Sequence, residues 1–496
     1  MATYKDATND EVDVALQSSW KAFREYRQIN LKDRAHFLHS IASALDLATQ
    51  QLIAVADEET HLGEARLKVE LKRTIFQLNS YAQACEEGTW LDIRIDTGDA
   101  NRNPPKPDLR KMLVPLGPVV VFGASNFPFA YSTAGGDTAC ALAAGCTVLL
   151  KAHPAHAATS EMVADVVSQA AKQCGLPDGV FIHLHGAGFE TGTALVRHPL
   201  TKAVGFTGSY GGGKALFDLA NNRSVPIPVF AEMGSVNPVF LLPQKLKEET
   251  GEVAAMYASS ITQGGGQFCT NPGLLIAIED DALNEFKKQL GKLLSDVRPV
   301  KMLHAGIAKS FHQNRAKMLA EKGVSISAVT AFEAGEEETI PTLAEVTANI
   351  FLQNPLLHQE VFGPFSLLVK CKDMQEMLQV ANALEGQLTA NLMATDEEVK
   401  EHPALVETLQ DICGRFVLNG APTGVEVALA MHHGGPYPAT TDSRFTAVGA
   451  DGIKRFARPV CYQGWSDDLL PQELKNKNPL QLWRTVNNAL TKDAVT

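Results

Sequence analysis

Three consecutive glycines precede a single cysteine in the stretch Gly264-Gly265-Gly266-Gln267-Phe268-Cys269-Thr270. Glycine adopts backbone angles that other residues resist and lets the chain pass close to another group. The cysteine thiolate is the strongest nucleophile among the side chains. The stretch therefore has two interpretations: a tight turn beside a buried, inert thiol, or a loop that presents Cys269 to a substrate.

Two more polar residues with chemical uses follow apolar runs upstream of this cysteine. Asn126 comes after Val119–Phe122 and is either a turn residue or an amide donor to a developing oxyanion. Glu232 comes after Ile227–Phe230. It is either a structural hydrogen-bond acceptor or, if a nucleophile lies nearby, a general base.

A nucleotide site is suggested by a lysine and a glycine-rich turn. Lys151 follows the run Thr147–Leu150 and either faces solvent or supplies a point charge to a ribose or phosphate. The stretch Phe206–Gly213 reads as a strand, a glycine turn and the start of a helix, where backbone N–H groups favour a phosphate. Its spacing is not GxGxxG, so a flexible connection remains the alternative.

Short apolar runs alternate with helical stretches between residues 114 and 233, which predicts a doubly wound parallel α/β sheet. Ligands bind beyond the carboxyl ends of such strands, so the polar residues named above should meet at one edge. The expected strands are Val119–Phe122, Thr147–Leu150, Val180–Leu184, Ala203–Phe206 and Ile227–Phe230, with helices near 132–144, 157–174, 190–197 and 213–221.

The flanking regions have different patterns. Residues 8 to about 90 are helical in pattern, and the Thr8–Glu11 stretch has capping-box spacing. A second alternating region follows Met233. We expect its strands at Val239–Leu242, Leu274–Ile278, Ser366–Val369 and Arg415–Leu418, and its helices near 252–262 and 282–294. Glu333–Glu338 should be a solvated loop. The segment from His432 to Gly449 should be irregular, and the tail beyond Pro471 is polar and helix-prone.

Composition narrows the function further. The chain has 496 residues, long enough for two or three lobes, and carries 44 Lys plus Arg against 56 Asp plus Glu, a net charge of −12. This balance disfavours nucleic acid or an anionic membrane as the main partner. The eight cysteines show no metal-site or disulfide spacing, and no apolar run is long enough to span a bilayer. We expect a cytoplasmic protein without a metal.

Six motifs in order make the chain resemble the aldehyde dehydrogenase superfamily, over roughly residues 10 to 465. They are Phe122-Gly123-Ala124-Ser125-Asn126-Phe127-Pro128, Leu150-Lys151, Phe206-Thr207-Gly208-Ser209, Glu232-Met233-Gly234, Gly266-Gln267-Phe268-Cys269 and Glu360-Val361-Phe362-Gly363-Pro364. Further stretches, including Lys151–His156 and His433–Thr440, are similar to the branch with 2-oxoglutarate semialdehyde (2,5-dioxopentanoate) dehydrogenases and a bacterial NADP-dependent fatty aldehyde dehydrogenase.

The resemblance implies a role for each matching position. Cys269 would be the nucleophile, Glu232 the general base, and Asn126 with the Cys269 backbone N–H the oxyanion hole, where losing one donor would cost on the order of 3 kcal/mol. The implied cofactor-binding residues are Lys151, Gly208, Ser209, Gly213, Gly234, Glu360 and Phe362. Pro154 stands where the family often has an acidic residue for the adenosine 2′-OH, and His153 and His156 flank it, so both NAD and NADP are expected.

The reaction implied is NAD(P)-dependent oxidation of a small polar aldehyde, best matched by 2-oxoglutarate semialdehyde. Arg415 and Arg444 are candidate partners for its carboxylate, whereas Phe127 and Phe129 would suit a medium- or long-chain aldehyde. A cysteine acyl-transferase or hydrolase using Cys269 with a histidine such as His433 is a more distant alternative, and a non-catalytic binding protein is another.

The family also implies a domain organisation. We expect a cofactor-binding domain of residues 1–97 and 116–233, a catalytic domain of 234–430, and a bridging β element and tail of 98–115 and 431–496. The bridging element would pair two subunits through an exposed sheet edge, which predicts a homodimer.

Overall fold

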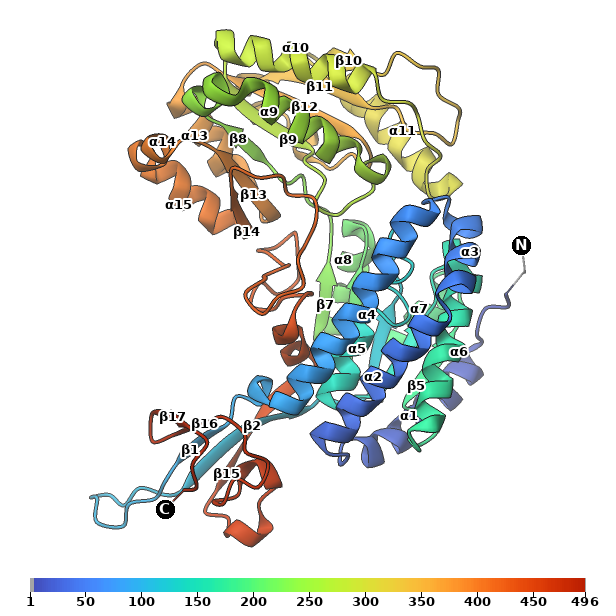
Figure 1. The fold of residues 1–496 in the computed structure, drawn as a ribbon, viewed down its shortest axis with the longest axis vertical. Helices are drawn as coiled ribbons and strands as arrows, with labels where there is room; N and C mark the ends of the chain where they lie inside the picture. The colour runs from blue at the N-terminus through green and yellow to red at the C-terminus, as the bar shows by residue number, and fades with distance from the viewer. Residues whose placement is uncertain (1–3, 496) are drawn as a thin grey trace.

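Three β-sheets organise the chain, and the computed structural model, which describes residues 4–495, places them in separate parts of the molecule (Figure 1). The first is the predicted parallel sheet, in the order β5-β4-β3-β6-β7. Its strands are β3 (Val119–Phe122), β4 (Val148–Lys151), β5 (Phe181–Leu184), β6 (Ala203–Thr207) and β7 (Val229–Glu232). The strand order reverses beside β3, so the crevice beyond β3 and β6 is the expected ligand site.

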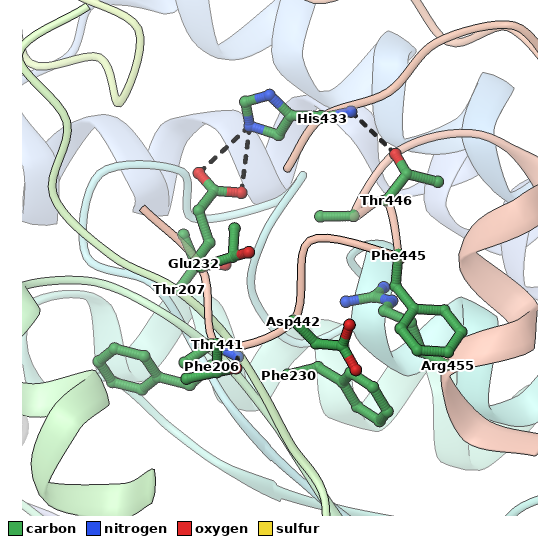
Figure 2. A pocket seen from close by; sticks show the side chains of 13 residues that line it. Phe206, Thr207, Phe230, Glu232, His433, Thr441, Asp442, Phe445, Thr446 and Arg455 are labelled. Carbon is green, nitrogen blue, oxygen red and sulfur yellow. Dashed lines mark hydrogen bonds and ion pairs between the residues drawn. The ribbon is translucent and has the colours of Figure 1, made fainter. Parts of the chain in front are cut away.

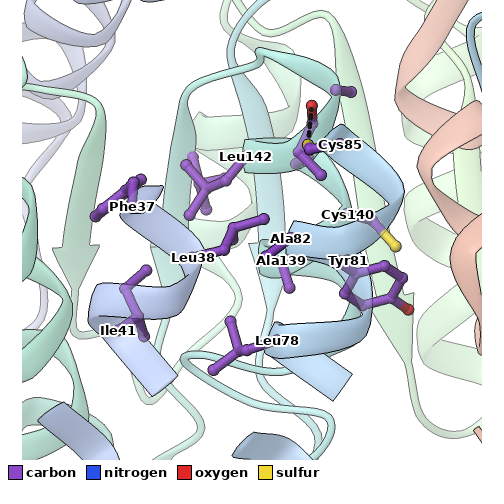
Figure 3. Packing of buried hydrophobic residues seen from close by; sticks show 14 of the residues in the cluster. Phe37, Leu38, Ile41, Leu78, Tyr81, Ala82, Cys85, Ala139, Cys140 and Leu142 are labelled. Carbon is purple, nitrogen blue, oxygen red and sulfur yellow. Dashed lines mark hydrogen bonds between the residues drawn. The ribbon is translucent and has the colours of Figure 1, made fainter. Parts of the chain in front are cut away.

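Helices cover both faces of this sheet, as the near-continuous apolar strands require. They are α1 (Asn9–Tyr26), α2 (Leu31–Leu47), α3 (Thr49–Thr60), α4 (Glu64–Glu87), α5 (Gly136–Ala144), α6 (Ala157–Gln173), α7 (Glu190–Arg197) and α8 (Tyr210–Asn221). The predicted capping box at Thr8 and Glu11 starts α1. Figure 3 shows the core on one face, where Leu38 of α2, Leu78 of α4 and Leu142 of α5 pack together.

The second sheet has seven strands in the order β10-β11-β12-β9-β8-β13-β14, parallel except for the pair β10 and β11. The strands are β8 (Val239–Leu241), β9 (Leu274–Ile278), β10 (Ser325–Val329), β11 (Thr342–Thr347), β12 (Phe365–Cys371), β13 (Gln387–Met393) and β14 (Cys413–Leu418). The helices are α9 (Pro243–Thr262), α10 (Asp281–Ser295), α11 (Ala305–Leu319), α12 (Ala348–Gln353), α13 (Met374–Ala383), α14 (Asp396–Glu401) and α15 (Pro403–Ile412). The α/β prediction is confirmed, but β10, β11 and β13 were not anticipated.

The third sheet projects away from the other two (Figure 1) and has the order β15-β2-β1-β16-β17. Its strands are β1 (Arg94–Asp96), β2 (Leu109–Pro115), β15 (Ala457–Gln463), β16 (Arg484–Val486) and β17 (Ala489–Thr491). Two expectations were wrong here. The boundary at residue 97 separates β1 from its partner β2, and the helix-prone tail instead adds two strands, because β16 extends the sheet beside β1.

Two further features of the chain bear on the site. Residues 432–449 run without a regular helix or strand, as predicted, and Met233 N–H donates to Ala439 O at 2.8 Å, which fastens this segment to the end of β7. None of the helices found between residues 4 and 495 has the length and apolar character needed to cross a membrane.

Candidate active site

The cysteine loop depends on its glycines. Gly264, Gly265 and Gly266 have φ angles of 55°, 66° and 67°, a left-handed run that side chains with a Cβ resist. A Cβ on Gly266 would also collide with the backbone at Gly363 and Pro364. The loop therefore packs directly against the segment that carries Glu360. This is the close approach to another group that the three glycines predicted.

Two buried asparagines hold the loop in place. The Asn271 amide donates to Gly266 O at 2.8 Å and to Gly363 O at 2.7 Å. The Asn237 amide donates to Cys269 O and Asn271 O, both at 2.9 Å. Backbone carbonyls on both sides of the thiol are thus fixed by side chains that the sequence did not single out.

The catalytic candidates converge at this loop. Glu232 ends β7, Asn126 follows β3, and the Asn126 amide donates to Gln267 O at 3.2 Å. His433 lies between Glu232 and Cys269. Its Nε2 is 3.6 Å from Cys269 Sγ and 3.2 and 3.1 Å from the two carboxylate oxygens of Glu232, the contacts drawn as dashed lines to Glu232 in Figure 2.

The electrostatics of the group set its resting state. The pKa of Cys269 is raised well above its usual value, first by burial and then by the charge and hydrogen bond of Glu232. Burial also acts to raise the pKa of Glu232, but the charge and hydrogen bond of His433 and the hydrogen bond of Cys269 outweigh it and lower that pKa. These opposite shifts favour a neutral thiol on Cys269 beside an ionised carboxylate on Glu232.

A cavity of about 190 Å³ lies on one side of Cys269. Its lining includes most of the predicted cofactor residues, namely Gly208, Ser209, Gly234, Glu360 and Phe362, together with Asn126 and Glu232. Ser209 caps the N-terminus of α8, where backbone N–H groups attract a phosphate. The residues present therefore fit a dinucleotide.

Glu360 occupies the part of this cavity nearest Gly234. A Cβ on Gly234 would lie 2.7 Å from Glu360 Oε2, so only glycine leaves room for that carboxyl. Burial raises the pKa of Glu360 to about 8, although a backbone hydrogen bond from Ser235 opposes the shift. At neutral pH the carboxyl is mostly protonated and can donate as well as accept a hydrogen bond.

Two predicted cofactor residues lie outside this lining. Lys151 ends β4 and is buried, which lowers its pKa, with His153 two residues further along. Gly213 lies inside α8, where a Cβ would come within 2.6 Å of the Met233 side chain. Its lack of a side chain serves the packing of α8 against β7. Cofactor contacts at both positions remain predictions.

A second, larger cavity of about 920 Å³ opens on Cys269. Helix α4, the aromatic rings of Phe127, Tyr131 and Phe268, and residues 424–426 form its walls. Phe127, Tyr131 and Cys269 line both cavities. The thiol therefore stands at their junction and can meet one ligand on each side.

His433 is the residue that sequence reasoning weighed only for a cysteine hydrolase. Such an enzyme needs a histidine that touches the thiol with one nitrogen and is oriented through the other. Here Glu232 and Cys269 share Nε2, and no group within residues 4–495 hydrogen-bonds the buried Nδ1. This arrangement disfavours the hydrolase alternative.

The possible ligand atoms of Glu232, Cys269 and His433 lie within 4.8 Å of one another, so a thiophilic ion such as Zn²⁺ would compete for the thiol.

Replacing His433 by glutamine should move the acid limb of the pH–rate profile to higher pH. His433 lowers the pKa of Glu232, so its loss leaves less ionised base at a given pH. A lost hydrogen bond to a charged group corresponds to about a 10- to 100-fold fall in turnover on the acid side. Steady-state rates across pH test this, with His432→Gln as the control. An acid limb that stays in place would contradict the role given to His433.

Comparisons with known proteins agree with this geometry. Residues 1–444 match the profile of the Aldehyde dehydrogenase family. The chain is 46% identical over 484 residues to alpha-ketoglutaric semialdehyde dehydrogenase 2 of Azospirillum brasilense, covering 96% of this chain and 91% of that one. It is 44% identical over 494 residues to alpha-ketoglutaric semialdehyde dehydrogenase of Acinetobacter baylyi, covering 99% and 93%.

Solved structures share the fold. A 1-pyrroline-5-carboxylate dehydrogenase from Thermus with bound NAD superposes with a TM-score of 0.76 at 21% identity, covering 92% of this chain and 86% of that one. The resemblance that rested on six motifs is confirmed over nearly the whole length. The chain belongs to the aldehyde dehydrogenase family.

Proposed function

We propose that this aldehyde dehydrogenase oxidises 2-oxoglutarate semialdehyde to 2-oxoglutarate, with NAD or NADP as the hydride acceptor. The position of Cys269 at the junction of two cavities carries the proposal. One cavity has the residues for a dinucleotide, and the other admits an aldehyde from the opposite side. The two relatives at 44–46% identity support this choice of substrate.

The chain's own groups account for the covalent steps. The Cys269 thiolate attacks the aldehyde carbon, and the Asn126 amide with the Cys269 backbone N–H stabilises the resulting oxyanion. A dinucleotide bound in the smaller cavity supplies the hydride acceptor. Glu232 then takes a proton from a water molecule that hydrolyses the thioester on Cys269, which frees the carboxylic acid.

Both nicotinamide cofactors fit the adenosine end of the expected site. Pro154 leaves no carboxylate at that position to repel a 2′-phosphate. His153 stacks with His156 at a centroid distance of 5.6 Å and lies 6.0 Å from His304. Burial, followed by the repulsion from His156, Lys151 and His304, lowers the pKa of His153 well below its usual value, so a 2′-phosphate would meet a polar but uncharged ring.

A steady-state panel tests the substrate. Oxo-acid semialdehydes and aliphatic aldehydes of increasing length are assayed with NAD and with NADP. We expect the highest kcat/KM for 2-oxoglutarate semialdehyde. A preference for medium- or long-chain aldehydes would instead favour the fatty aldehyde alternative. Of the two phenylalanines predicted to suit such a substrate, Phe127 lines the larger cavity, together with Phe268, whereas Phe129 is buried in the core and lies outside the lining.

The proposed assembly is a homodimer in the cytoplasm. β15 and β14 end their sheets, so each has an edge that a second chain can pair with. Phe416 and Leu418 of β14 are exposed, by 38% and 52%, and would be covered by such pairing. All eight cysteines are free thiols, as a reducing compartment would keep them.

A further inference from the structure

Three arginines line the larger cavity beside Cys269. Arg66 and Arg73 come from α4, and Arg415 comes from β14. The hydrogen-bond partners of all three are uncharged: Asn126 O for Arg66, Tyr131 Oη and Val425 O for Arg73, and Gly424 O and Pro422 O for Arg415. The cavity therefore carries positive charge that its hydrogen bonds do not neutralise.

The nearest buried carboxylate does not cancel this charge. Glu70 accepts hydrogen bonds from the backbone N–H groups of Phe129 and Ala130 at 2.8 and 3.0 Å. Burial raises the pKa of Glu70 even though the nearby arginines act to lower it. With the exposed Glu426 also counted, the three arginines of the lining outnumber its two carboxylates. Burying a guanidinium without a counter-ion is costly unless a ligand supplies the charge.

Arg73 is the least satisfied of the three. Arg66 lies over the rings of Phe127 and Phe268, 5.2 and 4.9 Å from their centroids, and Arg415 donates to two loop carbonyls. Arg73 makes only long contacts, 3.5 Å to Tyr131 Oη and 3.4 Å to Val425 O. Within residues 4–495 each of the three arginines has one buried nitrogen without a partner, Nη1 in Arg73 and Arg66 and Nε in Arg415, so the long contacts are what distinguish Arg73.

Arg73 also acts on the reacting sulfur. Its positive charge opposes the rise in the pKa of Cys269, so the guanidinium is electrostatically coupled to the thiol. Tyr131, which Arg73 contacts, lines both cavities. Arg415 is coupled to Cys269 and Tyr131 as well. Arg444, the other arginine considered from the sequence, is exposed and paired with Asp442 at the surface.

We infer that Arg73 binds the distal carboxylate of the aldehyde substrate, with Arg415 as a second positive charge. The ligand class is a short aldehyde that ends in a carboxylate, and the inference rests on the proposed function. A five-carbon oxo acid holds its two ends roughly 5 Å apart, given C–C bonds of about 1.5 Å. A guanidinium is suited to a carboxylate because its planar N–H groups match the two oxygens.

The discriminating experiment compares two substrates of equal length. kcat/KM is measured for 2-oxoglutarate semialdehyde and for pentanal with wild type, Arg73→Met, Arg73→Lys and the control Arg444→Met. We expect Arg73→Met to lower the ratio of semialdehyde to pentanal efficiency by about 10- to 100-fold, mainly through KM, since a charge-assisted hydrogen bond is lost. Arg73→Lys should restore part of the ratio, and Arg444→Met should leave it unchanged.

An equal loss on both substrates would overturn the inference, because a merely structural arginine moves them together. A binding test separates the inference from the proposed function. Wild type and Arg73→Met are alkylated at Cys269 with iodoacetamide in the presence of 2-oxoglutarate or of pentanoate, which lacks the second carboxylate. The carboxylate site is supported if 2-oxoglutarate protects Cys269 more strongly than pentanoate does in wild type but not in Arg73→Met. This holds even if the semialdehyde proves a poor substrate. Equal protection of both proteins, or of neither, contradicts it.

Discussion

Cys269→Ser should lose dehydrogenase turnover by at least about 10⁴-fold, the scale seen when a covalent nucleophile is removed. The site raises the pKa even of the thiol, so a serine hydroxyl, which is far less acidic, would not ionise there. Binding of NAD(P) should persist, because Cys269 is one of fifteen residues in the lining of the smaller cavity. NAD(P)H formation measures turnover, and quenching of protein fluorescence on titration measures cofactor binding.

A matched control is available in Cys461, the one cysteine of the eight that is exposed. Cys461→Ser should keep wild-type turnover and wild-type cofactor affinity. If Cys269→Ser lost cofactor binding together with turnover, a folding defect would explain both. If it kept wild-type turnover, the assignment of Cys269 as the nucleophile would be wrong.

The first sheet was predictable because its strands are almost wholly apolar and are separated by glycine turns. Its strand β3 begins and ends where the predicted apolar run does, as β9 does in the second sheet. β13 was missed although every residue in it is buried, because it contains Gln387, Thr389 and Asn391. Each has a partner that the local pattern cannot reveal. Gln387 accepts from Val236 N–H, Thr389 donates to Asn237, and Asn391 donates to Gly420 O.

The tail was misread for a related reason. Residues beyond Pro471 are polar and suit a helix locally, but β16 pairs in parallel with β1, almost 400 positions earlier in the chain. Arg484 is fully buried in this strand and donates to carbonyls of the tail, including Asp493 O at 3.0 Å. Pairing at such separation leaves no periodicity in the local sequence.

In the site, the polar groups at strand ends and the glycine-flanked Cys269 were found from the sequence, whereas the contact of His433 with Glu232 and the role of Asn237 were not. Strand-end placement followed from sheet topology, which led to Asn126 and Glu232. His433 and Asn237 lie on segments without periodicity, and their roles depend on contacts formed only in three dimensions. The His433–Thr440 motif was visible as a branch signature, and His433 was considered as a partner of Cys269, but nothing in the motif indicated that its ring also contacts Glu232.

Glu232→Gln should slow steady-state turnover by about 10²- to 10⁴-fold, the usual contribution of a general base, while still giving one burst of NAD(P)H. The burst requires only thiolate attack and hydride loss, whereas thioester hydrolysis requires the carboxylate. The same substitution should speed alkylation of Cys269 at neutral pH. Glu232 raises the pKa of that thiol through its charge and hydrogen bond, and glutamine removes the charge, so more thiolate is present at a given pH.

The two readouts therefore move in opposite directions. A general loss of structure would also expose the thiol and speed its alkylation, but it would abolish the burst of NAD(P)H, so a retained burst together with a lowered alkylation midpoint identifies the effect of the carboxylate. Stopped-flow NAD(P)H absorbance gives the burst and the steady state, and iodoacetamide kinetics from pH 6 to 10 give the thiol titration, with the exposed Glu333→Gln as control. A burst that slows as much as turnover would mean that Glu232 deprotonates the thiol rather than the water. An alkylation midpoint that stays in place or rises would mean that the carboxylate does not govern the thiol.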